Sequence, residues 1–186
     1  MNKKDRCALI LCSDGKWRKR AEELVSAEYG GVFVDTFTRP GGVRRHHHLC
    51  EFTKEVIRDI SLISIGVNGS TEVDCVNHCL CGDYGGTMHS LTTQAQLHAA
   101  DIRKAKPMLR QKVHTKLLKL SDLSDPELKQ LFLGGIPPVP IVQIRRNIGR
   151  VLEQDFRVRG FWLGPSSLDL NTTPHPADCT LHEVED

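Results

Sequence analysis

Short apolar runs that alternate with amphipathic segments constrain the fold of this chain more than any other feature of its sequence. CALILC at residues 7–12 and VFVDTF at residues 32–37 are apolar enough for buried strands, and each run stops at a loop. Between them, residues 17–29 have the apolar spacing of a helix, which Gly30 and Gly31 end. A strand, a crossover helix and a second strand in this order predict a parallel sheet with right-handed connections.

The alternation continues through the rest of the chain. The later elements that we predict are a helix over residues 49–67, a strand over 72–77, a helix from Met88 that Pro107 interrupts, a helix over 141–154 and a final strand, near a sheet edge, over 156–163. The predicted fold class is therefore α/β, with an open, mainly parallel sheet flanked by helices. Residues 1–165 are expected to form a single domain, and the polar, proline-bearing residues 166–186 a mobile tail.

Composition and charge argue against several classes of function. The formal net charge of the 186 residues is +2, with both signs mixed along the chain, so neither nucleic acid nor a membrane surface is indicated as a partner. The apolar stretch near the N-terminus is too short for a signal peptide or a membrane span, and we expect a cytoplasmic protein. The seven cysteines are odd in number and scattered, which favours reduced thiols, some of them metal ligands, over a disulfide framework.

The segment VDCVNHCLCGD at residues 73–83 carries the main candidate for a functional site. Cys12 ends the first predicted strand, His78 ends the third, and Cys81 lies on the loop that follows. In open parallel sheets ligands bind beyond the carboxyl ends of the strands, so these side chains converge if the two strands are neighbours. Two thiolates and an imidazole suit zinc, and three protein ligands leave an open position, as in catalytic sites. Asp14, two residues past Cys12, could reach that fourth position.

Each of these residues also has a simpler interpretation. Cys12 alone would be a small buried hydrophobe, and His78 alone a core histidine with satisfied hydrogen bonds. Their combination with Cys81 at this spacing favours a metal, in which case Cys79 points away from it. The remaining candidates are predicted to be core residues or a solvated helix entrance: Cys7, Cys50, Cys75 and the run RRHHHL at residues 44–49.

Two short motifs resemble those of a known enzyme family. CSDGK at residues 12–16 resembles the Cys-x-Asp-x-Arg motif of β-class carbonic anhydrases, and HCLCG at residues 78–82 is similar to their His-x-x-Cys-Gly motif, in the same order. Between them, Arg39 and Gly42 match a family strand that ends in Arg-Asn-Ala-Gly. Residues 156–160 resemble the family's Leu-Arg-Val-x-Gly strand, so the resemblance spans most of residues 7–163.

The resemblance implies a zinc enzyme that hydrates carbon dioxide reversibly to bicarbonate through a zinc-bound hydroxide. It implies a β-carbonic-anhydrase-like fold with zinc at the carboxyl ends of the strands, and a homodimer or a higher homo-oligomer. The residue roles that it implies are metal ligation by Cys12, His78 and Cys81, catalysis by Asp14 and Lys16, and substrate binding by Arg39, Gly42 and Gly82.

Three positions depart from the family pattern: Pro40 and Gly41 replace the Asn and Ala of the strand motif, and the third departure bears on catalysis. Lys16 stands where the family pairs an arginine with the aspartate, and a lysine is a flexible point charge without the planar fork that binds a carboxylate at two points. Two other functions therefore stay open. The site could hydrolyse a related small molecule such as carbonyl sulfide or carbon disulfide, or it could be a catalytically silent, zinc-stabilised binding or assembly module.

Overall fold

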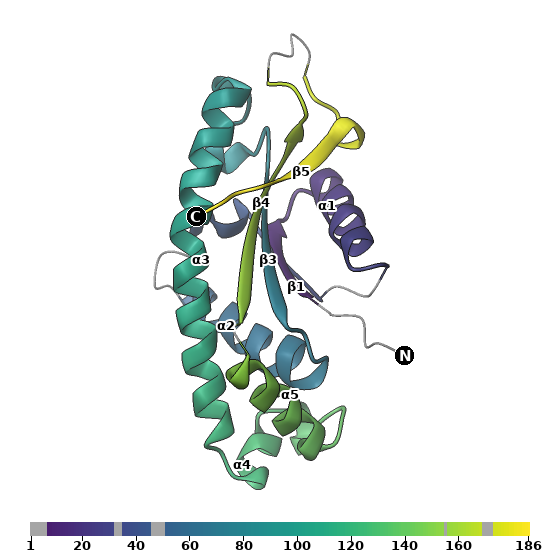
Figure 1. Ribbon diagram of the computed structural model, residues 1–186, viewed down its shortest axis with the longest axis vertical. Coiled ribbons are helices and arrows are strands. Elements are labelled where there is room, and N and C mark those ends of the chain that lie inside the picture. The colour runs from purple at the N-terminus through teal and green to yellow at the C-terminus, as the bar shows by residue number, and fades with distance from the viewer. Residues whose placement is uncertain (1–6, 32–34, 46–50, 155, 169–172) are drawn as a thin grey trace.

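The computed structural model describes residues 7–31, 35–45, 51–154, 156–168 and 173–186, and these form one five-stranded sheet covered by helices (Figure 1). The strand order is β2-β1-β3-β4-β5. The four parallel strands are β1 (Cys7–Cys12), β2 (Asp35–Arg39), β3 (Glu72–His78) and β4 (Arg157–Pro165), and the antiparallel strand is β5 (Cys179–Glu183). The predicted α/β class with a mainly parallel, helix-flanked sheet is confirmed.

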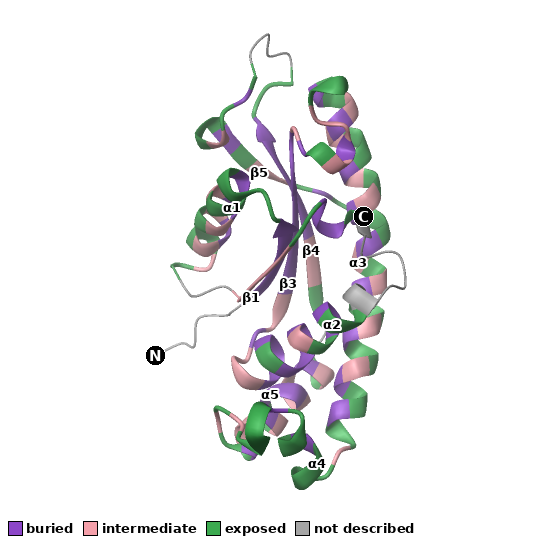
Figure 2. Ribbon diagram, turned by 180° about the vertical axis from the view of Figure 1, so that it is seen from behind, coloured by how far each residue is buried: buried purple, intermediate pink, exposed green. Residues whose placement is uncertain are grey.

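Helices lie on both faces of the sheet, as a parallel sheet requires (Figure 1). The helices are α1 (Gly15–Glu28), α2 (Glu51–Asp59), which continues as a π-helix over Ile60–Val67, α3 (Leu91–Ser121), α4 (Asp125–Gln130) and α5 (Ile141–Glu153). The α1 helix covers one face and α3 covers the other. Figure 2 shows β1 buried along its length, which explains why its sequence is a continuous apolar run. No helix among the described residues has the length and apolar character to cross a membrane.

The structure differs from the sequence prediction at two element boundaries and at one proline. The second strand begins at Asp35 and runs to Arg39, while residues 32–34 lie outside the described part of the chain. Met88, expected in a helix, belongs to a short 3-10 turn before α3. Pro107 was predicted to interrupt a helix, and this is wrong, because α3 runs through it without a break.

Packing explains why α3 tolerates its proline. Pro107 is exposed, so its ring lies on the solvent side of the helix and displaces no core side chain. The opposite side of the helix is fully buried, with Ile102, Ala105 and Leu109 all at 0% exposure. Burial of that apolar stripe on both sides of the proline outweighs the loss of one hydrogen bond.

The C-terminal segment is part of the sheet, which contradicts the expectation of a mobile tail for residues 179–183. These residues pair with the end of β4, so β4 is neither the final strand nor an edge strand. Cys179 is fully buried and its carbonyl oxygen accepts hydrogen bonds from Arg20 of α1. Lys106 of α3 donates to the carbonyl of Val184 at 3.0 Å and lies 2.6 Å from the Asp186 carboxylate. Backbone pairing with β4 and hydrogen bonds from Arg20 and Lys106 hold this segment in place. Its polar composition gave no sign of a strand in the sequence.

A buried charge pair joins the middle of β3 to β4. Asp74 is fully buried and lies opposite Arg159 in the strand register, with its carboxylate 2.8 Å and 3.0 Å from two guanidinium nitrogens. The Tyr29 hydroxyl at the end of α1 lies 3.2 Å from the same carboxylate. Burial raises the pKa of Asp74 to about 6, against the opposing effect of Arg159. This cluster therefore ties α1 to the centre of the sheet.

Replacing Asp74 with Ala should lower the free energy of unfolding by about 1.5–3 kcal/mol, because the Arg159 guanidinium would lose its fully buried partner and keep only Glu28 and Glu72. The control is Glu22→Ala, which removes an exposed pair with Arg18 and should cost less than about 0.5 kcal/mol. Chemical denaturation of the two variants and the wild type measures both values. Equal stabilities of the two variants would contradict the role given to the buried pair.

Candidate metal centre

Three potential metal ligands meet at the carboxyl ends of two neighbouring strands. Leu11 of β1 pairs with Val76 of β3, so Cys12 at the end of β1 lies beside the end of β3, where His78 is the last residue. Cys81 lies three residues beyond His78. All three are buried, at 6%, 3% and 4% exposure, and their ligand atoms lie within 4.8 Å of one another. The structure thus brings together the three residues that the sequence predicted, in an arrangement that could hold a metal ion.

The distances at this centre fit a tetrahedral ion. The two sulfur atoms of Cys12 and Cys81 are 3.7 Å apart. Metal–sulfur bonds of about 2.3 Å at a tetrahedral angle place two sulfur atoms about 3.8 Å apart. His78 Nδ1 lies 2.7 Å from the carbonyl oxygen of Cys79, which leaves Nε2 as the ligand atom. That Nε2 is buried and, among the described residues, has no hydrogen-bond partner. A metal ion bound to Nε2 would give this buried nitrogen the partner that it lacks.

The loop that carries Cys81 is held by a glutamine of α3. Leu80 has a left-handed backbone, with φ of 58°, which turns the chain so that Cys81 returns toward Cys12. Gln94 accepts a hydrogen bond from the Leu80 N–H at 2.6 Å and donates to the carbonyls of Gly86 at 2.9 Å and His89 at 2.8 Å. Gln94 is 1% exposed, so these bonds are shielded from water. Sequence analysis missed this residue, although a glutamine on the apolar stripe of a helix is a signal for such a role.

The hydrogen bond between the two thiols shifts their pKa values in opposite directions. A hydrogen bond from the Cys81 thiol lowers the pKa of Cys12 to about 3, with further help from His78 and the backbone N–H of Asp14. The same hydrogen bond raises the pKa of Cys81, and the backbone N–H of Asp83 opposes that rise. The pair therefore holds one thiolate readily, and metal binding releases the second proton.

A tryptophan of α1 fixes the imidazole plane. The rings of Trp17 and His78 are stacked, with centroids 5.1 Å apart and planes 11° apart. Trp17 is 6% exposed and therefore shields one face of the imidazole from water. Since His78 is also bonded through Nδ1, both the tautomer and the orientation of this ligand are set before a metal binds.

The expected dyad residues lie at the start of α1. The Asp14 carboxylate caps the helix by accepting a hydrogen bond from the backbone N–H of Lys16 at 3.2 Å, and both residues are exposed. Asp14 does not belong to the group of three close ligand atoms. Within the described residues, the interaction that joins Asp14 to Lys16 runs through the backbone amide and not through the ammonium group.

The three predicted substrate-binding residues have different surroundings. Arg39 ends β2, and its guanidinium lies 3.0 Å from the carbonyl of Thr38 and 4.0 Å from Glu55 of α2. Gly42 is buried with φ of 54°, and a Cβ there would come within 2.5 Å of the side-chain oxygen of Asn77. Gly42 is therefore required for packing beside the centre. Gly82 is exposed, with open space around its Cα.

The other cysteines behave as predicted where the structure describes them. Cys7, Cys75 and Cys79 are fully buried, and burial is the main reason that the pKa of each thiol is raised. They are therefore unreactive core residues. Cys50 and the histidines of the run at residues 44–49 lie outside the described residues.

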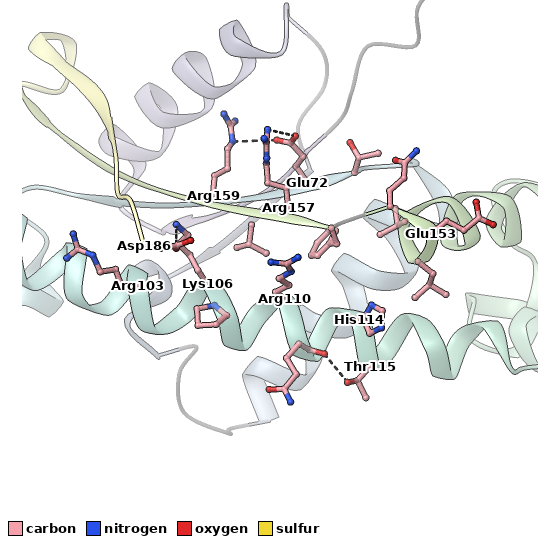
Figure 3. A pocket seen from close by; sticks show the side chains of 18 of the residues that line it. Glu72, Arg103, Lys106, Arg110, His114, Thr115, Glu153, Arg157, Arg159 and Asp186 are labelled. Atoms are coloured by element: carbon pink, nitrogen blue, oxygen red, sulfur yellow. Dashed lines mark hydrogen bonds and ion pairs between the residues drawn. The ribbon is translucent and has the colours of Figure 1, made fainter.

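A groove lies apart from the candidate metal centre, along α3, α5 and the start of β4 (Figure 3). Its volume is about 1480 Å³. Its cations bond to groups of the chain itself: Lys106 to Asp186, Arg157 to Glu72, and Arg103 to the carbonyl of Glu185. These pairs do not converge on a common point, so the groove lacks the arrangement that a binding site needs.

No protein-family model matches this chain, and no curated protein matches it. The residues and geometry of the metal centre are therefore the basis on which its function is inferred.

Replacing Cys81 with Ala should abolish tight metal binding, because the two remaining ligands do not hold a divalent ion firmly. Cys79→Ala is the matched control, since Cys79 is a buried thiol only two residues away and is outside the ligand group. Both Cys79→Ala and the wild type should bind one metal ion per chain. Elemental analysis of the purified proteins measures the content. Metal retained by the Cys81 variant would show that the ion is held elsewhere.

Replacing Gln94 with Ala should weaken metal affinity by about 10–100-fold, because the loop that presents Cys81 loses its hydrogen bonds to α3. Gln111→Ala removes an exposed glutamine from the same helix and should leave the affinity unchanged. Competition with a chromophoric chelator gives both dissociation constants. Equal affinities for the two variants would mean that Gln94 has no role at the centre.

Proposed function

We propose that this protein is a zinc enzyme that catalyses the reversible hydration of carbon dioxide to bicarbonate, with a β-carbonic-anhydrase-like fold. The observation that carries the proposal is the buried group of Cys12, His78 and Cys81 at the ends of adjacent parallel strands. Two sulfur ligands and one nitrogen ligand suit zinc, and three protein ligands leave a position for water or substrate. The order of the motifs along the chain, which resembles that family, supports the same assignment.

Bound zinc supplies a Lewis acid that lowers the pKa of a coordinated water toward neutrality. Two thiolates neutralise much of the ion's charge, so the chain must withdraw electron density from them. The backbone N–H groups of Asp14 and Asp83 do this, because they donate hydrogen bonds to Cys12 and Cys81 respectively. Each donor lies two residues after the cysteine it serves, at the start of a helical turn.

Asp14 is the proposed hydrogen-bond acceptor that orients the attacking group. Its carboxylate stands at the N-terminus of α1, where it accepts a hydrogen bond from the backbone N–H of Lys16. The Lys16 side chain is then of secondary importance, since its amide and not its ammonium group contacts the carboxylate. The proposal also includes a homodimer or higher oligomer, as the family resemblance implies.

One observation favours a second candidate, a catalytically silent zinc-stabilised module. The Asp14 carboxylate is exposed and bonded to its own helix, outside the close ligand group. If it stays there when zinc is bound, the centre has metal but no orienting group. A hydrolase of carbonyl sulfide or carbon disulfide would use the same ligands, and turnover assays separate it from the other two candidates.

The zinc-loaded protein should hydrate carbon dioxide above the uncatalysed rate, and Asp14→Ala should lower kcat by about 10²–10⁴ with zinc content unchanged. Lys16→Ala should retain kcat to within about threefold, because the backbone amide that holds Asp14 remains. Stopped-flow measurement with a pH indicator gives the rates. Full zinc occupancy without any hydration by the wild type would refute the enzyme and favour the silent module, while turnover of carbonyl sulfide alone would favour the hydrolase.

A further inference from the structure

A second buried histidine lies near the metal centre without a partner. His98 of α3 has 0% exposure, and neither of its ring nitrogens has a hydrogen-bond partner among the described residues. Buried polar groups are nearly always bonded, and leaving one unbonded costs free energy. An imidazole with two such nitrogens in a packed core therefore calls for a ligand that the chain itself does not supply.

Tyr84 connects His98 to the metal ligands. It is 5% exposed and packs in one buried cluster with Cys12 and Cys81. The His98 ring lies against the Tyr84 ring, with centroids 3.8 Å apart and planes tilted by 45°. Asn77, the residue before the ligand His78, donates a hydrogen bond to the Tyr84 hydroxyl at 3.0 Å. The position of His98 is thus fixed relative to the metal ligands by packed and bonded side chains.

The protonation state of His98 suits it to hydrogen bonding. Burial is the main cause that lowers the pKa of this imidazole to about 3. At neutral pH one ring nitrogen therefore donates and the other accepts. A neutral imidazole can contact a bound anion without adding charge to a centre that already holds a cation.

His98 is not one of the metal ligands in this geometry. The group of ligand atoms that all lie within 4.8 Å of one another contains Cys12, His78 and Cys81 and leaves His98 out. Its ring lies against Tyr84, which packs with Cys12 and Cys81, so its two nitrogens are available to a ligand beside that cluster. The close packing against Tyr84 keeps the ring from moving freely toward the ion.

We propose that His98 donates a hydrogen bond to a small oxyanion held at the open position of the metal centre, and so acts as a binding residue for that ligand. The inference rests on the proposed function, because it requires a metal with three protein ligands. It adds a contact from α3, an element that supplies none of the three ligands.

The test uses the full-length chain loaded with Co²⁺, whose visible spectrum reports on bound anions. Wild type, His98→Ala, His98→Gln and the control His114→Ala, an exposed histidine on the same helix, are titrated with bicarbonate at fixed pH. The dissociation constant for bicarbonate should rise about tenfold in His98→Ala, the loss expected for one hydrogen bond to a charged group. The side-chain amide of His98→Gln should recover part of that loss, and His114→Ala should match the wild type.

X-ray absorption of the same samples separates the ways in which the inference can fail. Two sulfur ligands and one nitrogen ligand in the wild type, unchanged in the His98 variants, support it. Two nitrogen ligands in the wild type and one in His98→Ala would make His98 a fourth ligand and overturn it. Equal bicarbonate affinity in wild type and His98→Ala would also overturn it, while leaving the proposed function intact. Failure of the wild type to take up Co²⁺ at its cysteines would refute the proposed function itself.

Discussion

The parallel pairing of β1 with β3 is the constraint on which the metal centre depends. Their register sets Leu11 beside Val76, and so brings Cys12 and the end of β3 to the same edge of the sheet. A slip of one residue would turn the Cys12 side chain to the opposite face, away from His78. The burial of both strands between two layers of helices prevents that slip, since every side chain of β1 would exchange its surroundings. The chemistry at the edge is therefore a consequence of the packing along the whole strand.

The residues around the three candidate ligands fix the positions of their side chains. Leu80 adopts a left-handed backbone that costs on the order of 1–3 kcal/mol for a residue other than glycine. The hydrogen bond from its N–H to Gln94 offsets part of that cost and turns the chain back at Cys81. Trp17, on the opposite face of the sheet, fixes the orientation of the His78 ring by stacking on it. Helices on both faces thus contribute one positioning side chain each, although neither helix carries a metal ligand.

Sequence patterns predicted the parts of this protein in which one local rule decides the structure. Apolar runs and their ends located the parallel strands, and ligand spacing located Cys12, His78 and Cys81. They could not identify Gln94 or His98, because both lie on the apolar stripe of α3 and only their contacts with the loop after β3 give them a role. They also failed at β5, where pairing with β4 outweighs the polar composition of the segment. They failed at Pro107 as well, where burial of the opposite side of α3 outweighs the missing N–H of the proline.

The size and position of the core bear on what the metal does. In small zinc modules the ion supplies much of the folding free energy, because too little apolar surface is buried without it. Here the large buried side chains, Leu9, Ile10 and Ile102 among them, lie along the strands and under α3, away from the edge that holds the ligands. The apolar burial of this core therefore does not depend on the candidate ligands. Together with the low pKa of Cys12, the oriented imidazole and the unpaired nitrogens of His98, this supports the proposed enzyme over the zinc-stabilised module.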